Sequence, residues 1–161
     1  MAYQKLQLAL AADVIKSDTI DIPLESSSQI TGESDAGAAN KLTDATKDFT
    51  AIQGLVNGAI IVNVTDGTIA TVTAIDSATV LSLSANIIQA GSKAYKIYLN
   101  PTANHGVGAI IYVGGAGDLK VKTASGSIVT YTGIPAGFFV PVQVLRVYST
   151  DTTATGLIAN W

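Results

Sequence analysis

Short runs of Val, Ile, Leu and Thr, each soon ended by a Gly, Pro, Asp-Gly or Asn-Gly signal, cover most of this sequence. Runs of this kind with alternating apolar and polar residues are typical of β-strands. The Asp66–Gly67 pair is the strongest hairpin signal, and it predicts a type I′ turn because that turn needs positive φ at both central residues. We therefore expect an all-β chain. A short helix over residues 3–14 is an alternative, since this stretch contains good helix formers.

The expected strands fall into groups separated by two stretches that read as linkers, residues 24–40 and 100–106. The first linker is rich in Ser, Gly, Ala and acidic residues. Alternation or continuous apolar character predicts strands at residues 18–23, 59–64, 68–75, 79–83, 95–99, 109–113, 118–122, 128–131 and, as one long strand with Pro141 hinting at a sheet edge, 139–148.

The charge content of the chain is unusually low. Only 13% of the 161 residues are charged while 48% are hydrophobic, and the net charge is −3. Nine scattered Lys and Arg residues argue against nucleic-acid binding, which needs clustered positive charge. No apolar run is long enough for a membrane-spanning helix, and we see no signal peptide. Two interpretations stay open: a surface that packs against other protein, or simply a neutral, Thr-rich β protein.

The residues that usually carry catalysis or metal binding are scarce. The chain has no Cys and one histidine, His105, which lies in the second linker. The acidic cluster of Glu25, Glu33 and Asp35 lacks the spacing of a calcium loop, and the glycine-rich stretch 114–117 is followed by a strand where a phosphate loop needs a helix. We therefore expect no enzymatic activity, no metal and no cofactor.

The large side chains near chain breaks are the candidate binding residues. Phe138, Phe139 and Trp161 fit either the core, which is the favoured interpretation, or a subunit interface, where aromatic residues and Arg concentrate binding energy. Arg146, the only arginine, is a further interface candidate. Leu6, Leu8 and Leu10 alternate in an N-terminal stretch that we expect to act as an arm, clamping a neighbour by strand addition.

Four segments of the last third stand out, residues 111–121, 133–137, 141–147 and 152–155, and so do residues 16–19 earlier in the chain. In these segments the chain resembles small phage structural proteins of the capsid-decoration and spike-base type. A looser resemblance, at residues 41–44, 65–68 and 74–79, links the middle of the chain to a module that also occurs in phage particle proteins.

This resemblance implies a domain organisation that periodicity alone does not give. We expect a jelly-roll-like β-sandwich formed by residues 1–30 and 101–161, with a small β-barrel or meander inserted at residues 31–100. Both junctions lie in linker-like sequence, where insertions are tolerated.

The resemblance also implies a role in the virion, assembled in the host cytoplasm. The leading hypothesis is a capsid decoration (cement) protein on the exterior of the shell, with the major capsid protein and further copies of itself, as a homotrimer, as partners. A tail, spike-base or adaptor component present in few copies is the alternative. A carbohydrate-binding protein is a third hypothesis, although such sites usually show exposed aromatic residues, which make up only 6% of this chain.

Overall fold

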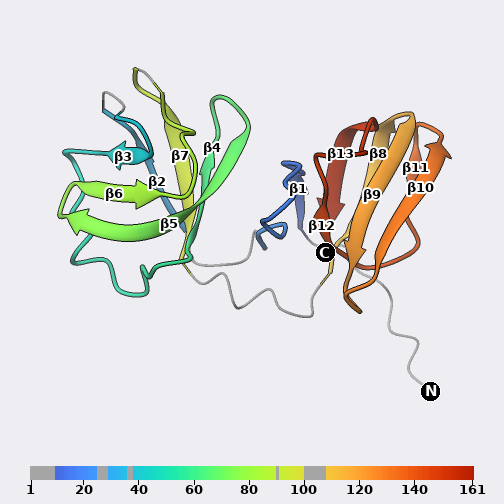
Figure 1. Cartoon of the computed structure of the whole chain (residues 1–161), viewed down its shortest axis with the longest axis horizontal. Helices are drawn as coiled ribbons and strands as arrows, with labels where there is room; N and C mark the ends of the chain where they lie inside the picture. Colours follow the sequence, from blue (N-terminus) through green and yellow to red (C-terminus); the bar gives the residue numbers. More distant parts are fainter. Residues whose placement is uncertain (1–9, 25–28, 36–37, 90, 100–107) are drawn as a thin grey trace. The chain divides into compact units, whose positions relative to one another are not determined.

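The computed structural model describes residues 10–24, 29–35, 38–89, 91–99 and 108–161. Within these residues the secondary structure consists of β-strands and turns, with no helix, as predicted. The chain divides into two compact units, Met1–Ser26 with Asn104–Trp161 and Ser27–Ala103 (Figure 1). The second unit is therefore inserted into the first.

The first unit is a sandwich of two antiparallel sheets. Its four-stranded sheet has the order β1-β13-β8-β11 and its three-stranded sheet the order β10-β9-β12. The strands are β1 (Ala11–Asp13), β8 (Ile110–Gly115), β9 (Gly117–Thr123), β10 (Ile128–Ile134), β11 (Phe138–Phe139), β12 (Val144–Val147) and β13 (Thr155–Asn160).

The pairing in this sandwich is nested, as in a hairpin that has been folded over as a whole. β1 pairs with β13, β8 with β11, and β9 with β10. Residues 17–22 complete the set beside β12: the Ser17 and Ile22 N–H groups donate to the Val147 and Leu145 carbonyls at 2.9 and 2.7 Å. First-with-last pairing across two sheets is the topology of a jelly roll, so the expected fold class is confirmed. In the sequence, the inserted unit lies between residues 17–22 and β8, the second and third members of this nested set.

Alternation places one apolar row of each sheet in the core of the sandwich. Ile111 and Val113 of β8 face Leu119 and Val121 of β9, and all four are fully buried. Such alternation keeps the polar residues between them on the outer faces. Trp161, half-buried, packs against this core.

The long strand expected over residues 139–148 is wrong. The chain pairs with β8 at Phe138 and Phe139, bends at Pro141 and pairs with β9 only from Val144 onward. Because this run crosses from one sheet to the other, Val140 and Val144 are both buried, each within the same core.

The inserted unit is a six-stranded sheet of order β2-β7-β4-β5-β6-β3. The sheet curls toward closure, because the Asp35 N–H at the end of β2 donates to the Thr43 carbonyl of β3 at 2.7 Å. Its strands are β2 (Gln29–Glu33), β3 (Lys41–Thr43), β4 (Ile60–Asn63), β5 (Thr68–Ser77), β6 (Val80–Leu83) and β7 (Ala94–Tyr98). The run β4-β5-β6 is the expected meander.

A buried polar pair lies inside this curled sheet. The Tyr95 hydroxyl donates to the Asp44 carboxylate at 2.7 Å, and both residues are buried. Thr46 donates to the other carboxylate oxygen through its N–H (2.9 Å) and its hydroxyl (2.6 Å). Gly32 passes so close that a Cβ there would lie 2.5 Å from the Tyr95 oxygen, so this position needs glycine.

Four local predictions differ from the structure. β2 lies in the stretch expected to be a linker, because its only large apolar residue, Ile30, gives no visible alternation. Its pairing with β7 puts residues 29 and 30 in the inserted unit, which begins at Ser27 where we expected residue 31. The hairpin at Asp66–Gly67 exists, but its loop spans residues 64–67 and only Gly67 of the pair has positive φ, so the turn is not type I′. Residues 11–13 form a strand, not part of a helix.

The Tyr95–Asp44 pair provides a test of the inserted unit. Burial raises the pKa of Asp44, but the hydrogen bonds from Thr46 and Tyr95 outweigh it and leave the pKa below its usual value. Tyr95→Phe leaves this buried carboxylate one donor short, so we expect the free energy of unfolding to fall by about 1–3 kcal/mol. Chemical denaturation followed by circular dichroism measures the change. Tyr131→Phe, at a half-exposed tyrosine of the sandwich, is the control, and equal effects of the two substitutions would contradict the assignment.

Candidate functional site

The two sheets have edge strands on the same side of the sandwich (Figure 1). These are β10 in the three-stranded sheet and β11 in the four-stranded sheet. No described strand pairs with the outer side of either. We call the surface formed by β10 and β11 the open edge. An unpaired edge presents free backbone N–H and C=O groups, and natural proteins usually protect such strands with charged side chains.

Apolar side chains of the open edge point into the sandwich but are not covered there. Val129 lies opposite the buried Val121, and Phe138 lies opposite the buried Val113, so both face inward. They are nevertheless 37% and 43% exposed. β11 is only two residues long, and it leaves the inner face of β10 partly uncovered.

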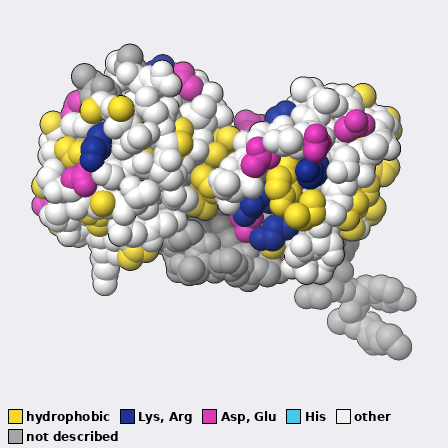
Figure 2. Space-filling view, in the orientation of Figure 1, with side chains coloured by type: hydrophobic (Ala, Val, Ile, Leu, Met, Phe, Trp, Pro, Cys, Tyr) yellow, Lys and Arg dark blue, Asp and Glu magenta, His cyan; other side chains and the backbone are white. Residues whose placement is uncertain are grey.

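The outward side of the open edge is apolar as well. Phe139 is 50% exposed and packs on Tyr112 of β8, with ring centroids 5.1 Å apart and a tilt of 56°. Ile128 at the start of β10 is 59% exposed. Figure 2 shows hydrophobic side chains gathered along this edge of the sandwich unit. The favoured interpretation of Phe138 and Phe139 as core residues is therefore wrong, and their role in an interface stays a prediction.

No charged residue occurs between Lys122 and Arg146. This interval contains the whole of the open edge, so nothing there repels an apolar partner or protects the edge strands. The exposed apolar area of Ile128, Val129, Phe138 and Phe139 is roughly 300 Å², taking about 200 Å² for a whole aromatic side chain. A patch of this size on a soluble protein often marks a site of interaction.

Arg146 is not part of this surface. Its Nε donates to the Asp21 carboxylate at 2.7 Å and its Nη1 donates to the Asp18 carbonyl at 2.9 Å. Lys122 adds a second, longer ion pair to Asp21 at 3.5 Å. These contacts hold residues 17–22 against β12 within the sandwich. Arg146 therefore has an internal structural role, and its role in an interface stays a prediction.

The structure describes one of the three leucines of the expected arm. Leu6 and Leu8 lie outside the described residues. Leu10 is exposed and pairs with Trp161, with hydrogen bonds of 3.2 and 3.0 Å between their backbones. Trp161 itself is half-buried against the core. The pairing of β1 with β13 thus extends to Leu10.

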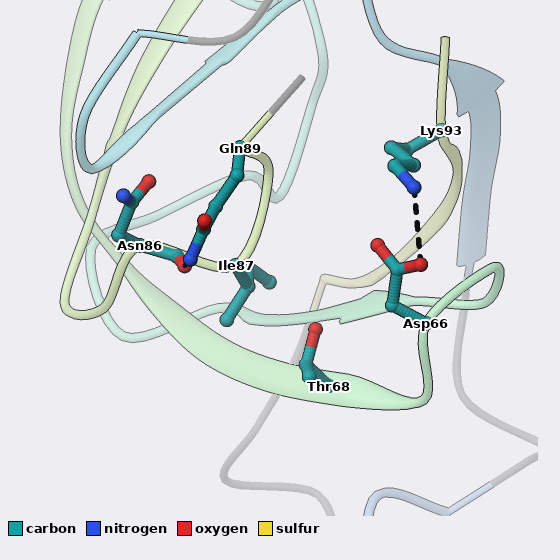
Figure 3. A pocket seen from close by; sticks show the side chains of 6 residues that line it. All are labelled: Asp66, Thr68, Asn86, Ile87, Gln89 and Lys93. Atoms are coloured by element: carbon teal, nitrogen blue, oxygen red, sulfur yellow. Dashed lines mark hydrogen bonds and ion pairs between the residues drawn. The ribbon is translucent and has the colours of Figure 1, made fainter. Parts of the chain in front are cut away.

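The inserted unit carries a shallow hollow of about 370 Å³. Figure 3 shows Lys93 and Asp66 facing each other on one side of it, with Asn86 and Gln89 across from them. The Lys93 Nζ lies 3.0 Å from an Asp66 carboxylate oxygen. The hydrogen bonds from Lys93 and the buried Asn63 lower the pKa of Asp66, so this carboxylate is ionised and already paired. Among the described residues that line the hollow, none has an aromatic side chain on which a sugar ring could stack.

The described residues bring together no catalytic constellation. They contain no group of three or more His, Asp or Glu side chains placed to hold a metal ion, and His105 lies outside them. In the same part of the chain, no helix is long and apolar enough to cross a membrane. The arrangement that stands out among the described residues is the uncharged, apolar open edge.

Comparisons with known proteins add no relative. No protein-family model matches the chain, no curated protein is significantly similar in sequence, and no solved structure matches the fold.

The polar contacts beside β12 predict a pH-dependent stability. The Asp18 carboxylate accepts hydrogen bonds from the Ser149 hydroxyl (2.6 Å) and from the N–H and hydroxyl of Thr150 (3.0 and 2.9 Å). These bonds, that of Ser149 foremost, lower the pKa of Asp18 from 3.8 to about 2. Because the folded-state pKa is depressed, the stabilisation is complete above pH 3.8 and is lost as the pH falls through about 2.

We expect Asp18→Ala to lower the thermal unfolding midpoint at pH 7. The difference from wild type should shrink as the pH is taken from 4 toward 2, which a thermal series over pH 2–7 measures. Asp13→Ala, at an exposed carboxylate of β1, makes the same charge change without removing these bonds. A difference that stays constant down to pH 2 would contradict the role assigned to the ionised carboxylate.

Proposed function

We propose that the chain is a structural protein of a phage particle and acts as a capsid decoration protein. The observation that carries the proposal is the open edge, an uncharged apolar surface with unpaired strands that fits a protein partner. The resemblance of residues 111–121, 133–137, 141–147 and 152–155 to decoration and spike-base proteins supplies the setting, and these residues belong to the jelly-roll unit.

The mechanism would be binding alone. Copies of the chain would bind the outer surface of the shell across junctions of the major capsid protein and hold neighbouring subunits together. Burying apolar area contributes about 25 cal/mol per Å², so the roughly 200 Å² that Ile128 and Phe139 expose would supply several kcal/mol before the cost of association. Contacts of this size add up when one oligomer binds several sites at once, because each later contact is intramolecular.

The low charge of the chain supports the same proposal. A surface of Thr, Ser, Ala and Gly has few charged groups to desolvate when it packs on a regular protein shell. The described residues that line the polar hollow of the inserted unit include no aromatic side chain, so the hollow gives little support to the carbohydrate-binding hypothesis.

Binding to shells tests the proposal. Purified protein mixed with shells that lack it should sediment with them and saturate at a fixed ratio to the major capsid protein. Phe139→Glu places a charge in the open edge, and we expect it to weaken binding at least tenfold, about 1.4 kcal/mol. Val64→Glu, at a residue of the inserted unit that is 55% exposed, is the matched control.

The outcomes separate two failures. Wild-type protein that does not sediment with the shells would contradict the decoration role itself. Binding of wild type that Phe139→Glu leaves unchanged would keep the role and remove the open edge from it.

A further inference from the structure

The open edge has the properties of an acceptor for one added strand. The Tyr148 N–H donates to the Lys120 carbonyl at 2.9 Å, so the backbone of Lys120 faces β12 and not β10. Lys120 lies opposite Thr130. In an antiparallel pair such residues direct their N–H and C=O groups away from each other. The N–H and C=O of Thr130 therefore point to the free side of β10.

Size argues for a strand as the occupant. A stable protein–protein interface buries about 800 Å² on each partner, more than twice our estimate for the exposed apolar residues of the open edge. Two open edges facing each other through side chains alone would fall short of this area. An added strand also forms a ladder of backbone hydrogen bonds, and its side chains can cover Val129 and Phe138 from the uncovered side.

The chain carries a segment with the pattern of such a strand. In residues 5–10 leucine alternates with Lys, Gln and Ala, so Leu6 and Leu8 share one face with Leu10. Such a strand offers the open edge an apolar face with no charge on it. Its one charged residue, Lys5, belongs to the opposite face.

The chain from Leu10 back to Leu6 is too short to bring Leu6 or Leu8 to the open edge of the same molecule. Leu10 is fixed beside Trp161, at the side of the four-stranded sheet opposite β11. Three strand spacings of about 4.8 Å, about 14 Å in all, separate β1 from β11. β10 lies in the other sheet, about 10 Å further in the perpendicular direction, so about 17 Å separate it from β1. At about 3.5 Å per residue, Leu8 reaches at most about 7 Å from Leu10 and Leu6 about 14 Å. Neither can lie along its own β10.

We propose that residues 1–9 of one copy add as a strand to the β10 edge of a second copy, with Leu6 and Leu8 covering the inward-facing Val129 and Phe138. The outward-facing Ile128 and Phe139 then stay available to another protein partner. Donor and acceptor are different surfaces, so the contact is head-to-tail and closes into a ring when the rotation between copies allows it. A ring of three matches the expected trimer. This inference concerns the protein alone and does not depend on a role in the virion.

The test uses full-length protein in solution, with its mass measured by light scattering during gel filtration. Wild type should elute at a multiple of the 16.5 kDa chain, three copies for the trimer. Leu8→Glu should give 16.5 kDa, whereas Gln7→Glu, with the same new charge on the opposite face, should stay oligomeric. Residue 8 belongs to none of the described strands. Circular dichroism of Leu8→Glu should therefore match that of wild type, so that a loss of assembly is separated from a loss of folding.

The acceptor is tested by Thr130→Pro, which removes the outward N–H and leaves the hydrogen bonds to β9 in place, since proline is tolerated on edge strands. It should also give 16.5 kDa, while Thr130→Val, which keeps the N–H, should assemble. Circular dichroism compares the folding of both variants.

Complementation gives the sharpest outcome. Protein lacking residues 1–9 keeps the acceptor, and Thr130→Pro keeps the donor. Each alone should be monomeric, and an equimolar mixture should form one-to-one dimers through a single junction. Monomeric wild type, assembly of the deletion variant at the wild-type mass, or a mixture that stays monomeric would each overturn the proposal.

Discussion

Apolar side chains between the two sheets of the sandwich are stably buried only where both sheets cover them. Val113 of β8 and Val121 of β9 meet this condition and are fully buried. Val129 and Phe138 lie on the same inward faces one strand further out, where the coverage ends, and they are exposed by more than a third. The same packing that builds the core thus creates the open edge, because β11 is too short to cover β10.

The opposite side of the sandwich is arranged differently. Residues 17–22 make only the two backbone bonds to β12 given above, but Asp18 and Asp21 add hydrogen bonds and ion pairs to Arg146, Ser149 and Thr150. Charged groups therefore hold one side of the jelly roll closed, while the other side has neither charge nor a paired strand among the described residues. This asymmetry directs protein contacts to β10 and β11. A chain with so little charge could not leave such an edge uncovered without a risk of aggregation.

Local signals in the sequence predicted the strands well, and nonlocal contacts account for most of the errors. Alternation, continuous apolar runs and turn residues located β4 to β10, because each of these strands carries its own apolar signal in the sequence. β2 was missed because a single isoleucine defines it, and its strand character comes from pairing with β7. The run from Phe139 to Tyr148 reads as one strand because alternation does not show that the chain changes sheets at Pro141.

Phe138 and Phe139 were assigned to the core because size and hydrophobicity indicate burial, whereas coverage depends on the length of the neighbouring strand. Arg146 was selected as a lone arginine, but its partners Asp18 and Asp21 lie far away in the sequence.

We propose that this jelly roll of low charge is a component of a phage shell. Quantitative mass spectrometry of purified phage particles tests the proposal by counting copies of the chain against copies of the major capsid protein. We expect hundreds of copies of the chain, in a fixed ratio to the major capsid protein. About a dozen copies would place the chain at a vertex or in the tail and contradict the decoration role, and its absence from the particle would contradict any role in the virion.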